Sequence, residues 1–249
     1  MKHFSIPPIQ RYDYLRRYRQ IVGILAKHGF GYLIDQLGLA RYLAWPGRRL
    51  GRVRKEDALT LAEHLRLALE ELGPTFIKLG QILSTRPDLV PPEYFVELAK
   101  LQDEVPPFPS EEAREQIEKE LGKPIEELFL SFEDQPLAAA SLGQVHQATL
   151  LKGEQIVVKV QRPNIEQIIE TDLEILLDLA RLAQERASLA EASNLPEIVQ
   201  DFADILWDEL DYELEGHNAD RFRQNFAQEP VLCIPRVYWE YTTKRVLTL

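Results

Sequence analysis

The hydrophobic pattern of this 249-residue chain changes near residue 132, and that change limits the folds open to it. Before this point, apolar residues recur every three or four positions, which is typical of amphipathic helices. After it comes Ile156–Val160, a β-branched run interrupted only by Lys159, which predicts a buried strand. Strands of this kind beside long helices indicate the α+β class, with an antiparallel sheet.

Turn residues and breaks in the pattern set the bounds of the expected elements. We expect helices over residues 9–45 (broken near Gly29 and Gly31), 56–72, 75–85, 93–103, 110–122, 165–188 and 196–227. We expect strands over residues 142–151, 156–160, 231–239 and 244–249. The chain then divides into a basic amphipathic segment (1–55), a helical extension (56–125) and a small lobe of sheet and helix (126–249).

The net charge of −11 is distributed unevenly along the chain. Residues 1–55 carry twelve Lys or Arg and two acidic residues, whereas residues 56–249 carry seventeen Lys or Arg and thirty-eight acidic residues. The acidic body argues against nucleic acid as a partner, because each neutralised phosphate needs a nearby cation. The basic segment suits an anionic membrane surface or packing on its own protein, and both alternatives stay open. No membrane-spanning run or signal-peptide pattern occurs, so we expect an intracellular, peripheral location.

Small residues precede the expected strands, and Lys159 follows Val145 by fourteen positions. In protein kinases, a G-x-G-x-x-G-x-V loop and a V-A-I-K strand have this order, and here alanine replaces the first two glycines. A loop with little side-chain bulk presents backbone N–H groups to phosphates, and a strand lysine supplies positive charge. Both features also have structural explanations. A run of small residues is typical of tight packing, and a lysine within a strand is typical of an exposed sheet edge.

Two further motifs strengthen the functional interpretation, although each alone is typical of a solvated helix face. They are Lys78-Leu79-Gly80-Gln81 and Glu209-Leu210-Asp211. Together with the alanine-rich loop, these K-x-G-Q and E-x-D motifs resemble those of the UbiB family of atypical kinase-like proteins. That family is named for its tie to ubiquinone and other prenylquinone metabolism. The resemblance runs from about residue 10 to Leu249.

The resemblance implies a protein-kinase-like small lobe with a helical N-terminal extension. Lys159 would bind nucleotide phosphates with Glu215 as its ion-pair partner, and Lys78 would reach over the cleft to Glu209. On a single helix, Glu209 and Glu215 project roughly 120° apart, so that one helix addresses both lysines. Gln81 and Asp211 complete the two motifs. The implied cofactor is ATP with Mg²⁺, and the residues expected to bind the nucleotide are Ala138, Ala139, Ala140, Ser141, Gly143, Val145 and Lys159.

The match to a kinase stops at the small lobe. The sequence contains no H-R-D-like catalytic loop, no second Mg²⁺ ligand and no D-F-G-like triplet, so the Mg²⁺ ligands and the large lobe lie outside this chain. The five histidines lack metal-ligand spacing, so no metal site is expected either. We therefore expect the chain alone to be inactive in phosphoryl transfer and to need a large lobe or a partner protein. The alternative is a non-catalytic module that docks on a membrane or a partner.

Overall fold

The computed structural model describes residues 8–39, 59–101, 106–186, 194–229 and 231–249. Two compact units emerge from the contacts within the chain. The helical unit comprises residues 1–102 and 167–203, and the sheet unit comprises residues 103–166 and 204–249. Parts of the expected first two helices, residues 40–45 and 56–58, lie outside the described residues. The three segments expected from the sequence stay a prediction.

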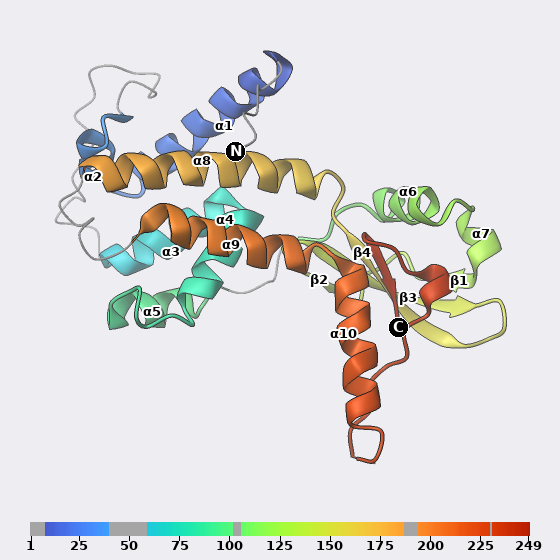
Figure 1. Ribbon diagram of the computed structural model, residues 1–249. Helices are drawn as coiled ribbons and strands as arrows, with labels where there is room; N and C mark the ends of the chain where they lie inside the picture. Colours follow the sequence, from blue (N-terminus) through green and yellow to red (C-terminus); the bar gives the residue numbers. More distant parts are fainter. Residues whose placement is uncertain (1–7, 40–58, 102–105, 187–193, 230) are drawn as a thin grey trace. The chain divides into compact units, whose positions relative to one another are not determined.

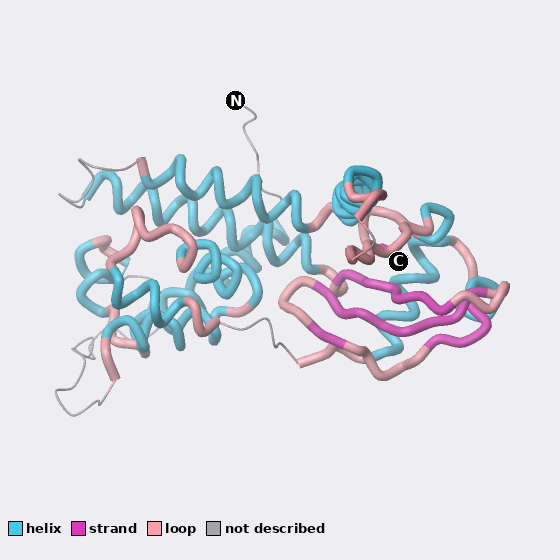
Figure 2. Tube along the Cα trace, turned by 90° about the horizontal axis from the view of Figure 1, so that it is seen from below, coloured by secondary structure: helices cyan, strands magenta, loops and turns pink. Residues whose placement is uncertain are grey.

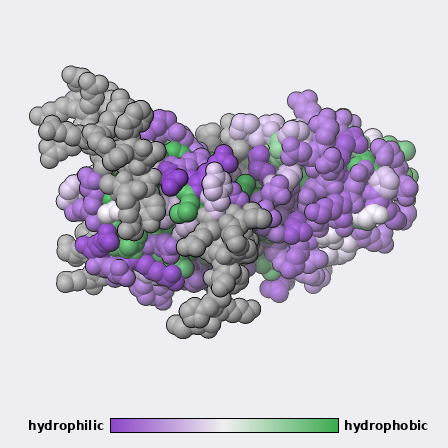
Figure 3. Space-filling view, turned by 90° about the horizontal axis from the view of Figure 1, so that it is seen from above, coloured by the Kyte–Doolittle hydropathy of each residue, from purple (hydrophilic) through white to green (hydrophobic). Residues whose placement is uncertain are grey.

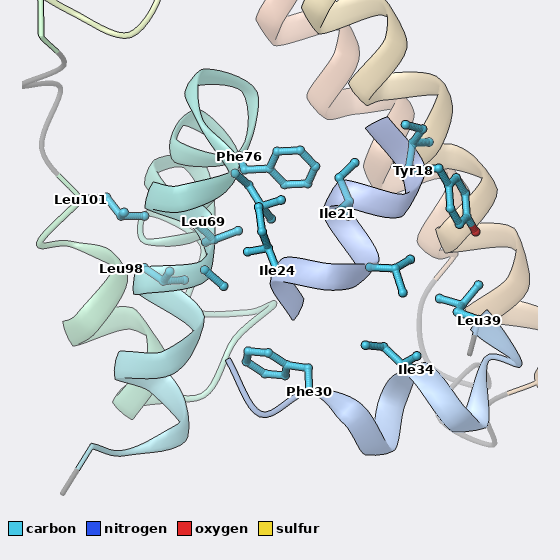
Figure 4. Close-up of a cluster of buried hydrophobic side chains, with 14 residues drawn as sticks. Tyr18, Ile21, Ile24, Phe30, Ile34, Leu39, Leu69, Phe76, Leu98 and Leu101 are labelled. Carbon is cyan, nitrogen blue, oxygen red and sulfur yellow. The ribbon is translucent and has the colours of Figure 1, made fainter. Parts of the chain in front are cut away.

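Most helices of the helical unit pack around one apolar cluster (Figure 4). The elements of this unit are α1 (Pro8–Lys27), α2 (Gly31–Gln36), α3 (Leu61–Leu72), α4 (Pro74–Leu83), α5 (Pro92–Leu98), most of α8 (Ile165–Arg186) and the first part of α9 (Leu195–Glu209). Among the described residues, those of α9 are not part of this cluster. On α1, Tyr18, Ile21 and Val22 are buried, as the three-and-four spacing predicts. The apolar face of α1 is thus covered by its own unit.

The start of α3 differs from the sequence expectation because a capping box fixes it. The hydroxyl of Thr60 accepts a hydrogen bond from the Glu63 backbone N–H at 3.2 Å, and the Glu63 carboxylate accepts one from the Thr60 N–H at 2.6 Å. These bonds satisfy N–H groups that a helix start leaves without partners, so the helix begins at Leu61 rather than at residue 56. They also hold the pKa of Glu63 below its ordinary value.

A buried carboxylate joins four helices of the helical unit. Asp172 on α8 is 0% exposed and accepts two hydrogen bonds from the Arg17 guanidinium, at 2.6 and 2.9 Å. The hydroxyl of Thr75 on α4 donates a third bond at 2.8 Å. Arg17 also donates to the Leu72 carbonyl at the end of α3, at 2.7 Å. Because a buried charge is tolerated only when it is paired and hydrogen-bonded, this cluster fixes the register of the helices.

The sheet unit consists of an antiparallel sheet flanked by helices (Figures 1 and 2). The strands are β1 (Phe129–Phe132), β2 (Ala138–Ala139), β3 (Gly143–Leu150), β4 (Gln155–Gln161) and β5 (Val246–Thr248). They are ordered β1-β3-β4-β5, and β2 also pairs with β3. The helices are α6 (Ser110–Leu121), α7 (Ile125–Leu128), α10 (Tyr212–Asn225) and the 3-10 helix η3 (Trp239–Tyr241). The α+β class is therefore confirmed.

The two faces of β4 meet different helices because side chains alternate along a strand. Ile156, Val158 and Val160 are buried in one apolar cluster with residues of α6 and α7. Lys159 lies on the opposite face, and its partner residue Leu247 on β5 packs in a second cluster with Tyr212 of α10. The lysine that interrupts the β-branched run thus belongs to the α10 side of the sheet.

Two secondary-structure expectations are wrong near the C-terminal end. The single helix expected over 196–227 is divided into α9 and α10, because the Asp211 carboxylate accepts a hydrogen bond from the Leu214 N–H at 3.0 Å and starts a new helix. Residues 231–238 form no strand, and backbone pairing with β5 is limited there to the Tyr238 N–H and the Thr248 carbonyl, at 2.9 Å. Strand β1 was not expected.

In the view of Figure 3, hydrophilic residues cover most of the described surface, and hydrophobic residues form small separate areas. The described helices include none that is sufficiently long and apolar to span a bilayer.

We expect Asp172→Ala to destabilise the protein by about 3 kcal/mol, because it leaves the largely buried Arg17 without its counter-charge. Asp178→Ala is the matched control on the same helix, since this carboxylate is 51% exposed and should contribute less than about 1 kcal/mol. Urea unfolding followed by circular dichroism measures both losses. Equal losses in the two variants would contradict the role assigned to Asp172.

Candidate functional site

Strand register brings three of the expected nucleotide-binding residues into one row across the sheet. Ala138 on β2 pairs with Val145 on β3, Val145 pairs with Lys159 on β4, and Lys159 pairs with Leu247 on β5. Residues directly opposite each other in an antiparallel sheet project from the same face. Ala138, Val145 and Lys159 therefore share one face, although Lys159 lies 21 positions after Ala138 in the sequence.

The alanine-rich loop forms a tight hairpin, which we call the alanine turn (Ala138–Gly143). The Ala140 N–H donates to the Gly143 carbonyl at 2.8 Å, which leaves Ser141 and Leu142 at the tip. Both tip residues are buried, and the Arg162 N–H donates to the Leu142 carbonyl at 2.9 Å. The turn is thus fastened to the end of β4 and presents its small side chains, with Ala138 exposed and Ala139 and Ala140 half-buried.

Close approach of neighbouring groups requires glycine at position 143. A Cβ atom there would lie 2.5 Å from the Val160 carbonyl oxygen and 2.6 Å from the hydroxyl oxygen of Tyr212. Real Cβ atoms do not come this close to other atoms, so any side chain would push β3 away from β4 or displace Tyr212. The last glycine of the loop pattern therefore has a structural reason independent of any ligand.

An ion pair lies beside this turn. The Lys159 ammonium nitrogen is 2.9 and 2.6 Å from the two carboxylate oxygens of Glu215 on α10. The same nitrogen lies 4.5 Å from the centroid of the Tyr212 ring. The side chains of Lys159 and Glu215 are 33% and 43% exposed, so the pair is open to solvent and to a ligand. Burial raises the pKa of the Tyr212 hydroxyl well above its ordinary value, and the charges of Glu215 and Glu209 add to this.

The E-x-D motif spans a break between two helices. Glu209 is the last residue of α9, and Asp211 is the N-cap of α10. The Lys244 ammonium also lies 3.7 Å from the Asp211 carboxylate. The expectation that Glu209 and Glu215 project from a single helix is therefore wrong. Asp211 has a structural role, because its cap sets where α10 begins and hence where Glu215 stands.

The K-x-G-Q motif lies on α4 in the helical unit. Gly80 is buried, and a Cβ there would collide with the side chains of Leu101 and Leu69. The Gln81 amide donates a hydrogen bond to the Leu101 carbonyl at 3.3 Å. Both residues thus serve the packing of α4 within the helical unit. Lys78 is half-buried on the same helix, and its role toward a nucleotide stays a prediction.

Sequence reasoning missed a buried polar chain beneath the alanine turn. The Gln144 side chain accepts from the Phe108 N–H at 3.1 Å and donates to the Phe108 carbonyl at 3.3 Å. It also pairs with Nε2 of His146 at 2.8 Å, and Nδ1 of His146 lies 2.8 Å from the Glu133 carbonyl. These contacts require a neutral His146 that donates from Nδ1. The sequence signal for this pair is Gln144 and His146 at alternate positions of one strand, which places both polar side chains on the same face.

Comparison with known proteins agrees with this geometry. A sequence model of the ABC1 atypical kinase-like domain matches residues 100–249. A Pseudomonas paraeruginosa protein named "Probable protein kinase UbiB" is 45% identical over 241 residues, which cover 94% of this chain. The chain belongs to the UbiB family of ABC1 atypical kinase-like proteins. The family match and a solved structure similar to this chain together confirm the kinase-like small lobe with a helical extension.

Two further proteins are also similar to this chain. The protein sll1770 of Synechocystis sp. is 52% identical over 188 residues, which cover 76% of this chain and 32% of that protein. The solved complex of Rv3197 with erythromycin, from Mycobacterium tuberculosis, has a TM-score of 0.51 and 28% identity, and covers 75% of this chain and 47% of that one. The Pseudomonas relative is also longer, because this chain spans 45% of its length.

We expect Gly143→Ala to destabilise the sheet unit by about 1–3 kcal/mol, because the added methyl group meets backbone that cannot move freely. Gly23→Ala on α1 is the matched control, since a Cβ there meets nothing within 4 Å and alanine favours the helix. Thermal and urea unfolding measure both changes. Comparable stability of the Gly143 variant and the wild type would contradict the close approach.

Stability should fall in acid through His146. Burial lowers the pKa of this imidazole below its ordinary value of about 6.5. As the pH falls below about 6.5, the unfolded chain takes up a proton that the folded chain resists, so stability present above this pH is lost. We expect His146→Gln to reduce the change of the urea midpoint between pH 7.5 and 5.5 compared with the wild type. Parallel profiles for the wild type and the His146 variant would contradict this.

Proposed function

We propose that this chain supplies the nucleotide-binding small lobe of a UbiB-type atypical kinase. The observation that carries the proposal is the solvent-accessible Lys159–Glu215 ion pair on the sheet face that also bears Val145 and the alanine turn. Perturbed or paired charges in a kinase-like lobe are typical of phosphate binding. Membership of the UbiB family supports the same assignment.

The positive charge of Lys159 and the small side chains of the alanine turn support ATP as the ligand. Lys159 would bind phosphate oxygens as a point charge. Before the nucleotide binds, Glu215 would hold the ammonium in the ion pair. The small side chains of the alanine turn leave room for a triphosphate, and Val145 would pack against the adenine. When bound with Mg²⁺, ATP supplies a transferable phosphoryl group. The described residues include no cluster of three or more metal-ligating side chains, and we assign none to Mg²⁺.

The wider role that we propose concerns the whole protein. The UbiB name carried by the relatives supports a link to ubiquinone, other prenylquinones or membrane lipids. Lys78 would reach over the nucleotide cleft toward Glu209, as the family resemblance implies. Since this chain spans less than half of those relatives, we propose that phosphoryl transfer or ATP hydrolysis needs the remainder.

A docking module on an anionic membrane is the second candidate. Tyr12, Leu15, Arg16 and Arg19 are exposed and follow one another at positions i, i+3, i+4 and i+7 of α1, which places them on one helix face. Aromatic and basic residues together suit a membrane interface. Flotation with anionic vesicles that is lost at high salt, and in the Arg16→Glu, Arg19→Glu variant, would support this candidate.

Mg-ATP or Mg-ADP should raise the melting temperature of the wild-type chain, because a ligand of the folded state stabilises it by about 2.7 kcal/mol at a hundredfold excess over Kd. Lys159→Ala should abolish the shift. Lys152→Ala, an exposed lysine in the turn between β3 and β4, is the matched control and should retain it.

Absence of any shift with wild-type protein would refute nucleotide binding by this chain and favour the docking module. A phosphate-release assay adds a second criterion, because we expect no turnover from the chain alone. Robust Mg²⁺-dependent hydrolysis that Lys159→Ala removes would contradict the proposed need for further protein.

A further inference from the structure

The ion pair has a third member. Tyr212 is the first residue of α10 and stands one helical turn before Glu215, so both face the sheet. Its ring lies under the Lys159 ammonium, at 4.5 Å from nitrogen to centroid, within the range of cation–π attraction. Lys159 therefore contacts a carboxylate and an aromatic face that come from the same helix.

The ring is the rigid member of this trio. Tyr212 is 1% exposed and packs with Val237 and Leu247. Its backbone N–H donates to the Lys244 carbonyl at 3.1 Å, and its hydroxyl lies against Gly143 at the start of β3. The ring is thus held at both ends. The Glu215 carboxylate, in contrast, is 43% exposed, and an exposed ion pair is weakened by solvent and by side-chain freedom.

Tyrosine at this position is not explained by packing alone. Among the described residues its buried hydroxyl has no hydrogen-bond partner, which is unfavourable compared with a phenylalanine ring of the same shape. The hydroxyl does reach Gly143, so Tyr212 spans the distance between the lysine and the alanine turn. One side chain therefore sets the spacing of the two groups that would hold a nucleotide.

We propose that Tyr212 is a positioning residue for the Lys159 ammonium, through its ring face. The ring attracts the cation without forming directional bonds, so it holds the ammonium both in the pair with Glu215 and when that ammonium turns to a phosphate. Glu215 alone fixes the ammonium only while the ion pair is closed. The consequence for ATP affinity rests on the proposed function, whereas the contact between ring and ammonium does not.

NMR of the full chain labelled with ¹³C-lysine tests the contact without nucleotide. Protons beside an aromatic face are shifted upfield by its ring current, so we expect an upfield Cε–H signal that Lys159→Arg removes and thereby assigns. The signal should move to the ordinary lysine position in Tyr212→Leu and stay upfield in Tyr212→Phe. Tyr238→Leu is the control, because that ring stacks on Arg236 instead and its loss should leave the signal in place.

Titration with Mg-ATP then tests the consequence. We expect Kd to rise about three- to tenfold in Tyr212→Leu and to stay within about twofold in Tyr212→Phe. An unshifted Lys159 signal in the wild type, or unchanged affinity in a folded Tyr212→Leu variant, overturns the positioning role. Should that variant not fold, the wild-type signal still decides whether the contact exists. Failure of wild-type protein to bind nucleotide overturns the proposed function instead, while an upfield signal would still establish the contact.

Discussion

The Lys159–Glu215 ion pair is the contact on which the candidate site depends, because it joins the middle of the sheet to a helix 56 residues later in the chain. Strand register places Lys159 beside Val145, and Asp211 caps the start of α10 so that Glu215 faces the lysine. Glycine at position 143 lets the hairpin approach close enough for Tyr212 to touch it. The strand register, the helix cap at Asp211 and the glycine at position 143 all contribute to placing the two members of the ion pair.

The helical unit depends on a polar contact that is buried, unlike the solvent-accessible pair of Lys159 and Glu215. Asp172 is fully buried and shared by Arg17 and Thr75, so it specifies how the helices pack but offers nothing to a ligand. The K-x-G-Q motif illustrates the same division, since Gly80 and Gln81 serve packing. A motif shared by a protein family thus combines residues that build a helix contact with one, Lys78, to which our proposal gives a direct role.

Residues whose signal is local were predictable. The β-branched run around Lys159 became β4, and the spacing of apolar residues on α1 gave its buried face. Expectations failed where a side chain from a distant segment intervenes. The carbonyl of Leu210 accepts a hydrogen bond from Gln161, and Asp211 then caps a new helix. The apolar periodicity runs through this break, so it wrongly predicts one continuous helix in place of α9 and α10. Residues 231–238 have a strand-like composition, but a single backbone hydrogen bond from Tyr238 to β5 does not make them a strand.

By itself, the sequence determined the class of the fold, the positions of most helices, and which residue types stand ready for phosphate chemistry, because periodicity and turn residues act over a few positions. Only the tertiary structure decided that Tyr212 lies under Lys159 and that Gln144 and His146 support the turn. Such contacts depend on strand register and on where a helix begins, and a shift of one residue would turn each side chain to the other face.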